Sequence, residues 1–193
     1  TMGVSVRQGK VWLVFNETWV KTLPDEQLMG VLEHEILHVL HVHMIRLGGR
    51  NATLFNIAAD YAINQLIKRQ LPPSGCVNPP KEWLNQSSEF IYDRLDEQAT
   101  NIKINMPGGS GKGQGNEKDD GKGPNGEQTT DDHSGWGEGS AQDQTMAEAL
   151  AQAIAQEALQ KSRGTLPGGW EELVQNLLKP KVNWKTLLRH AIS

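Results

Sequence analysis

The run VLEHEILHVLHVHM, residues 31–44, decides how this 193-residue sequence is interpreted. It contains an HExxH pattern in which His34 and His38 lie one turn apart on the same face of a predicted helix. At that spacing both imidazoles can reach one tetrahedral metal ion, about 2.0–2.1 Å from each ring nitrogen. Glu35 follows the first histidine and is suited to act as general base on a metal-activated water. The run therefore predicts a zinc hydrolase site.

The residues around this motif are apolar on most sides, which is typical of a buried helix and predicts one over 23–47. Thr22 is expected to cap it, with Asp25 as the partner in a capping box and Pro24 in the first turn. The pair Gly48-Gly49 is expected to end it.

The other predicted elements flank this helix. Residues 4–6 and 11–15 are rich in β-branched and aromatic side chains and predict an antiparallel hairpin. A second long helix begins at Asn51 and ends before residue 71, and a polar stripe runs along it at Asn56, Asp60 and Asn64. Further helices are predicted over 89–95 (capped by Ser87-Ser88), 141–161, 170–179 and 184–189.

Composition divides the chain into three predicted parts. Residues 1–100 carry the motif and form the predicted core. Residues 101–140 are rich in Gly, Asp, Lys, Asn and Gln and contain few apolar residues besides Trp136, which predicts a flexible loop or linker. Residues 141–193 return to helical patterns and are expected to pack on the core.

Composition also bounds the function. The single cysteine, Cys76, cannot form an internal disulfide, so a reducing, cytoplasmic location is expected. The sequence has no signal-peptide pattern and no apolar run of about 18 residues, so no membrane association is expected. A net charge of −4 with scattered lysines and arginines predicts no nucleic-acid partner. Because Thr1 precedes Met2 and a strand pattern follows almost at once, a fragment or processed form is expected.

A catalytic zinc usually takes three protein ligands, so HExxH leaves one ligand to find. His41 lies too far along a straight helix from His34, and His43 is expected to point to the opposite side. Asp60 is better placed, as a lone charge in an apolar helix that a metal could compensate. The alternative for Asp60 is a salt bridge to Arg46 or Arg50. The full candidate set is Asp60, His41, His43, Cys76, Asp131, Asp132 and His133.

Several segments together resemble a known family. They are LPDEQLMGVLEHEILH at 23–38, a later His43 and Arg46, and NIAADYAIN at 56–64, with weaker likeness at 89–92, 131–136 and 180–184. This pattern is similar to the putative metallopeptidase domain of bacteria and phages, most strongly over residues 11–68. The family commonly precedes a von Willebrand factor A-like domain, which would be a partner or regulator absent from this chain.

The resemblance implies a zincin-like α+β fold, mostly helical with a small antiparallel N-terminal sheet. It also implies Zn²⁺ ligands at His34, His38 and Asp60, with Glu35 as catalytic base. The predicted function is zinc-dependent hydrolysis of a peptide or protein substrate, with His133 as a donor to the oxyanion from the mobile tract. The alternatives are a metal-stabilised binding or scaffold protein, a latent enzyme activated by a partner, and an all-helical module without metal.

Overall fold

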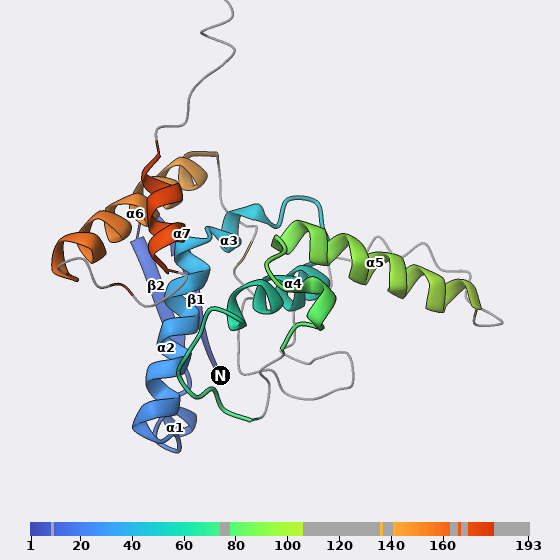
Figure 1. Ribbon diagram of the computed structural model, residues 1–193, viewed down its shortest axis with the longest axis horizontal. Helices are drawn as coiled ribbons and strands as arrows, with labels where there is room; N and C mark the ends of the chain where they lie inside the picture. Colours follow the sequence, from blue (N-terminus) through green and yellow to red (C-terminus); the bar gives the residue numbers. More distant parts are fainter. Residues whose placement is uncertain are drawn as a thin grey trace, which may run out of the picture.

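In the computed structural model the described residues are 1–8, 10–73, 78–105, 136, 141–162, 166 and 170–179. This part of the chain is mostly helical with one small antiparallel sheet at the N-terminus, as predicted (Figure 1). None of its helices is long and apolar enough to cross a membrane. The elements are β1 (Met2–Arg7), β2 (Lys10–Phe15), α1 (Glu17–Val20), α2 (Asp25–Leu40), α3 (His43–Arg46), α4 (Ala52–Asn64), η1 (Lys81–Trp83), α5 (Ser88–Asn105), α6 (Ala141–Lys161) and α7 (Trp170–Leu178).

The hairpin forms where the sequence predicts it. Strands β1 and β2 pair antiparallel, with Val4 opposite Leu13. Met2 and Val4 of β1 are buried and β1 packs against α2, whereas residues 12–15 of β2 are exposed. The hairpin therefore contributes to the core through its first strand.

The start of α2 differs from the prediction. Asn16 caps the short helix α1, its side chain accepting from the backbone N–H of Trp19, and the Thr22 hydroxyl donates to the Trp19 carbonyl. Thr22 thus closes α1 instead of capping α2. The N-cap of α2 is Pro24, which has extended backbone angles and makes no side-chain capping bond.

The prediction of one continuous helix over 23–47 is wrong at its C-terminal end. α2 ends at Leu40, and Val42 adopts the left-handed conformation, with φ 57° and ψ 34°, before α3 begins at His43. Such a conformation costs a β-branched residue about 1–3 kcal/mol and persists only where its surroundings enforce it. Here the Val42 side chain is buried against Ala147 and Ala151 of α6.

α4 and α5 pack on one another beside α2. α4 begins after Asn51, close to the predicted start, and Asn51 caps it by accepting from the N–H of Leu54. α4 ends at Asn64, earlier than the pattern indicates. Ser87 accepts from the N–H of Phe90 at the start of α5, which runs to Asn105, past the predicted end. Ala58 and Ala62 of α4 pack with Ile91 of α5 and with Trp83.

α6 and α7 lie on the other side of α2 from α4 and α5 (Figure 1). Their core contacts with α2 join Leu40 to Ala155 and Val174. The helix predicted at 184–189 lies outside the described residues, and the three-part division of the chain stays a prediction.

Candidate metal centre

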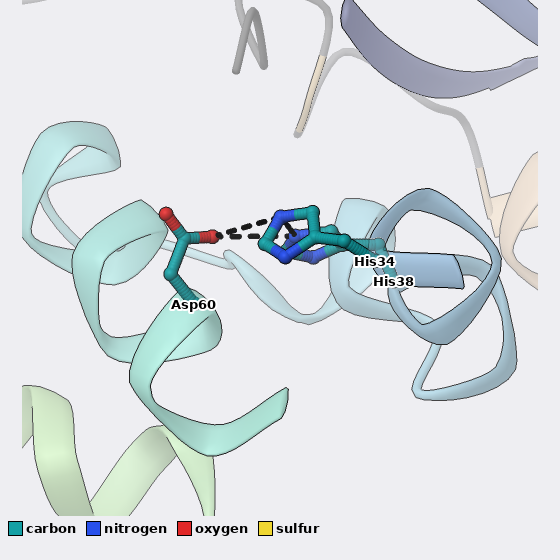
Figure 2. A group of neighbouring side chains, drawn as sticks. All are labelled: His34, His38 and Asp60. Atoms are coloured by element: carbon teal, nitrogen blue, oxygen red, sulfur yellow. Dashed lines mark hydrogen bonds and ion pairs between the residues drawn. The ribbon is translucent and has the colours of Figure 1, made fainter. Parts of the chain in front are cut away.

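The side chains of His34 and His38 point from α2 toward Asp60 on α4 (Figure 2). The two histidine Nε2 atoms lie 2.8 Å apart. Asp60 Oδ1 lies 3.2 Å from Nε2 of His38 and 3.6 Å from Nε2 of His34. Ligand atoms at three corners of a tetrahedral zinc site are about 3.3 Å apart, so the triangle has the size that such a site requires.

The chemistry of this donor set also fits zinc. Two imidazole nitrogens and one carboxylate oxygen form a three-ligand set of a kind that catalytic zinc sites use. His34, His38 and Asp60 are at most 5% exposed, and Glu35 is 1% exposed. Burying this many ionisable groups is unfavourable unless their charges are compensated, and a divalent cation would supply the compensation.

Asp60 reaches the two histidines because α4 presents its polar stripe to α2. Arg46 was one of the two arginines considered as a salt-bridge partner of Asp60, but it pairs with Glu89 instead. Its Nε lies 2.8 Å from Oε1 of Glu89, and its Nη2 contacts Oε2. Burial raises the pKa of Glu89, but the hydrogen bonds and charge of Arg46 more than offset it, so the pKa lies below its usual value. Arg50 donates to backbone carbonyls of Arg46 and Leu47.

Asn64 lies next to the centre, one turn beyond Asp60 on α4. Its Oδ1 is 2.7 Å from Nδ1 of His34, the ring nitrogen directed away from Asp60. Metal-binding histidines commonly donate this second N–H to an oxygen acceptor, which sets the tautomer and the ring orientation. The polar stripe therefore contacts a candidate ligand at Asn64.

The predicted orientation of His43, on the opposite side of the helix from the motif, is wrong. Its Nδ1 lies 2.9 Å from Nδ1 of His38, and its Nε2 lies 2.8 Å from Oγ of Ser88. The left-handed turn at Val42 redirects the chain and brings this side chain back. No periodicity signals such a turn at a valine, so the sequence offered no means of finding it.

Trp136 is a second unexpected neighbour of the centre. It comes from the tract predicted to be a flexible linker, yet it is buried, and its Nε1 donates to the Val4 carbonyl at 2.9 Å. The Trp136 and His38 rings lie 5.0 Å apart between centroids, in an edge arrangement. In the sequence, the only indication of this contact is that Trp136 is a large aromatic residue in a mostly polar tract.

His41 faces a different environment. It lines a cavity of about 290 Å³ between the α2–α3 turn, α6 and α7. Its Nε2 is buried and finds no hydrogen-bonding partner among the described residues. Burial, with a smaller effect of Arg46, lowers the pKa of His41 from 6.5 to about 4. His41 is thus a neutral histidine away from the metal centre.

The remaining predicted candidates lie outside the described residues. They are Cys76, considered as a ligand, and Asp131, Asp132 and His133, the last predicted to stabilise the oxyanion. Their roles stay predictions.

Residues 3–193 match the model of a family described as "Putative metallopeptidase domain". The chain belongs to this family. The match extends over nearly the whole sequence and includes α2, α4 and the residues of the candidate centre. No curated protein and no solved structure matches the chain. Membership of the family implies a metal and a hydrolytic role on peptides, and the buried His34, His38 and Asp60 could bind the ion.

Proposed function

We propose that this protein is a zinc-dependent peptidase of zincin-like architecture. The observation that carries the proposal is the triangle of His34 Nε2, His38 Nε2 and Asp60 Oδ1, whose sides of 2.8, 3.2 and 3.6 Å suit one tetrahedral ion. Family membership supports the reaction class.

Each residue would have a distinct part in hydrolysis. His34, His38 and Asp60 would hold the zinc, which supplies a Lewis acid for the peptide carbonyl and an activated water. Glu35 would accept the proton of the attacking water on its carboxylate and pass it to the leaving amine. Glu35 is only 1% exposed and directly follows the candidate ligand His34 on α2.

The test is hydrolysis of a mixed peptide library by zinc-loaded protein, with zinc content measured in the same samples. Glu35→Gln should keep stoichiometric zinc and lose activity by about 10²–10⁴-fold, the usual contribution of a general base. Glu33→Gln is the matched control, because Glu33 lies on the same helix but faces Arg69, at 3.8 Å. Full activity in Glu35→Gln would contradict the role of Glu35 as general base. Absence of zinc from the wild-type protein would contradict the proposed zinc site.

The deep burial of the centre favours a second candidate, a structural metal in a non-catalytic scaffold. All three candidate ligands are at most 5% exposed. A structural zinc has four protein ligands and no open position. Zinc-loaded protein that cleaves no peptide and binds no hydroxamate would support the scaffold, whereas hydroxamate binding would indicate an open coordination position.

A further inference from the structure

The two histidines among the candidate zinc ligands are supported in different ways. The Nδ1 of His34 meets an amide oxygen, that of Asn64, at 2.7 Å. The Nδ1 of His38 meets another imidazole, that of His43, at 2.9 Å. Metal-binding histidines usually donate this N–H to a carboxylate, a carbonyl or a water. An imidazole acceptor is therefore a feature of this site that needs its own explanation.

The proton positions along this contact follow from the ligand role. If Nε2 of His38 offers its lone pair to the metal, the proton of that ring is on Nδ1. That N–H can donate only to an unprotonated Nδ1 of His43, so the proton of His43 is on Nε2. Nε2 lies 2.8 Å from Oγ of Ser88, which can accept it. The chain of donors runs in one direction, from His38 through His43 to Ser88.

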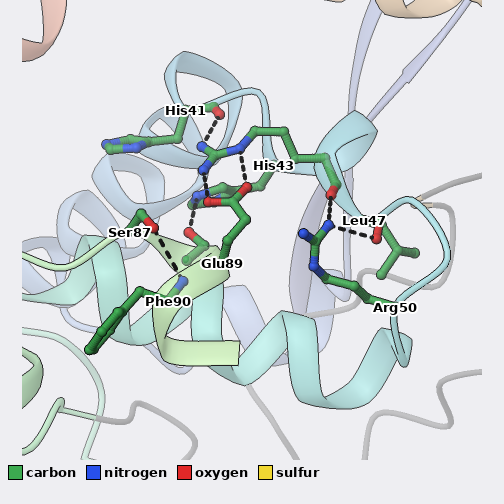
Figure 3. A network of polar contacts seen from close by, with 9 residues as sticks. His41, His43, Leu47, Arg50, Ser87, Glu89 and Phe90 are labelled. Carbon is green, nitrogen blue, oxygen red and sulfur yellow. Dashed lines mark hydrogen bonds and ion pairs between the residues drawn. The ribbon is translucent and has the colours of Figure 1, made fainter. Parts of the chain in front are cut away.

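The structure holds His43 firmly in this position. The side chain is fully buried, with Phe55 and Trp136 as ring neighbours at 6.3 and 6.1 Å between centroids. The left-handed turn at Val42 directs it toward His38. On its other side, Glu89 follows Ser88 on α5 and is paired with Arg46 of α3 (Figure 3). The Arg46–Glu89 pair thus fixes the donor helix α3 and the acceptor helix α5 together.

We propose that His43 is a positioning residue that orients the zinc ligand His38, through its Nδ1, and is itself oriented by Ser88. The inference rests on the proposed zinc site. Without an acceptor at that point, the proton of His38 could reside on Nε2 and the ring could rotate, and both changes would remove a ligand. Loss of such outer contacts typically weakens metal binding about 10–100-fold.

Charge explains why a neutral acceptor suits this position. Zinc would bring two positive charges into the buried site, and Asp60 and Glu35 already supply two buried carboxyl groups on α4 and α2. A carboxylate in place of His43 would be a third buried acidic group where solvent is excluded, and an uncompensated buried charge is costly. The imidazole of His43 provides the lone pair without that charge.

The first experiment measures zinc affinity by competition with a chromophoric chelator, with far-UV circular dichroism as the check on folding. We expect His43→Leu to bind zinc about 10–100-fold more weakly than the wild type. His43→Asn should recover most of the affinity, because its Oδ1 can take the place of Nδ1 as acceptor. The matched control, His41→Leu, removes a nearby histidine that faces the cavity instead and should leave the affinity unchanged.

Unchanged affinity in His43→Leu would overturn the inference. So would an equal loss in His43→Leu and His43→Asn, because it would indicate that only packing of the ring matters. Should His43→Leu fail to fold, Ser88→Ala provides the second variant, and we expect it to weaken zinc binding by a smaller factor, about threefold to tenfold. Zinc affinity equal to that of the wild type in Ser88→Ala would then contradict the hydrogen-bond chain from His38 through His43 to Ser88.

The second experiment needs no variant. Long-range ¹H–¹⁵N spectra of the zinc-loaded wild type should show His43 with a proton on Nε2 and none on Nδ1, and the reverse tautomer would overturn the inference. Both experiments are separate from hydrolysis. A wild type that binds zinc but cleaves no peptide would contradict the proposed function and leave the role of His43 standing, whereas zinc binding insensitive to His43 would contradict the inference alone.

Discussion

α4 and α5 lie on one side of α2, and α6 and α7 lie on the other (Figure 1). The two sides bury side chains of very different character. Toward α4, the buried side chains of His34 and His38 point to Asp60 (Figure 2), and the polar side chains of Asn64 and His43 contact their other ring nitrogens. Toward α6 and α7, the contacts are apolar and centred on Leu40, and a cavity of about 290 Å³ is present. One helix thus serves a polar centre on one side and an ordinary core on the other.

The histidines His41 and His43 show what this difference means. They are two residues apart, and both are largely buried. His43 lies on the polar side and has a nitrogen or oxygen neighbour for each ring nitrogen. His41 lies on the apolar side, where burial lowers its pKa to about 4. The neighbouring helices, and not the residue type, decide which histidine can take part in the candidate metal centre.

The largest effect is expected on the polar side, at Asp60. Asp60→Ala should weaken zinc binding at least about 100-fold, because it removes one of the three proposed ligands. Zinc at 100 times the wild-type dissociation constant should stabilise the wild type by about 2.7 kcal/mol, and at the same zinc concentration this gain should fall to about 0.4 kcal/mol or less in the variant. Thermal unfolding with and without zinc measures both, with the exposed Asp93→Ala as control. An equal gain in Asp60→Ala would show that Asp60 is not a ligand.

A second effect concerns how closely the chain after α4 approaches α2. A Cβ at Gly30 would lie 2.5 Å from the backbone oxygen of Gln70. Gly30→Ala should therefore destabilise the fold by about 2–3 kcal/mol, although alanine normally favours a helix. Gly49→Ala, where a Cβ meets nothing within 4 Å, should change the stability by less than about 0.5 kcal/mol. Urea unfolding compares the two, and equal stabilities would refute the close approach.

The smallest effect is expected on the apolar side. His41→Leu removes a buried nitrogen that has no partner among the described residues and should stabilise the metal-free protein by about 1 kcal/mol at pH 7. The folded state keeps His41 neutral down to about pH 4, whereas the unfolded chain takes up a proton below pH 6.5. Wild-type stability attributable to His41 is therefore complete above pH 6.5 and falls between pH 6.5 and 4.

The measurement is urea unfolding at a series of pH values for both proteins. The free energy of unfolding of His41→Leu should exceed that of the wild type by a margin that grows by at most about 2 kcal/mol from pH 7 to pH 5. An advantage that stays constant over this range would show that His41 titrates normally in the folded state. In that case the contrast between the two sides of α2 would not extend to the ionisation of its histidines.

Sequence patterns predicted the parts of the fold that depend on local chemistry. The hairpin, the start of α4 near Asn51, the cap at Ser87 and the helices over 141–161 and from 170 follow from propensity, capping and apolar spacing. The patterns were wrong at Thr22 and at residues 41–47. In both places a longer-range or competing contact overrode the local signal, through the hydroxyl bond of Thr22 to Trp19 and the packing of Val42 on α6.

By itself, the sequence determined that His34 and His38 share a helix face with Glu35 between them, because the helical repeat alone places residues four apart together. It also predicted a polar stripe on the next helix. Only the tertiary structure decided that Asp60 meets both histidines, that Asn64 and His43 reach their outer nitrogens, and that Trp136 lies beside His38. These contacts join residues from different elements, and their distances depend on how α2, α4 and α5 pack, which no periodicity encodes.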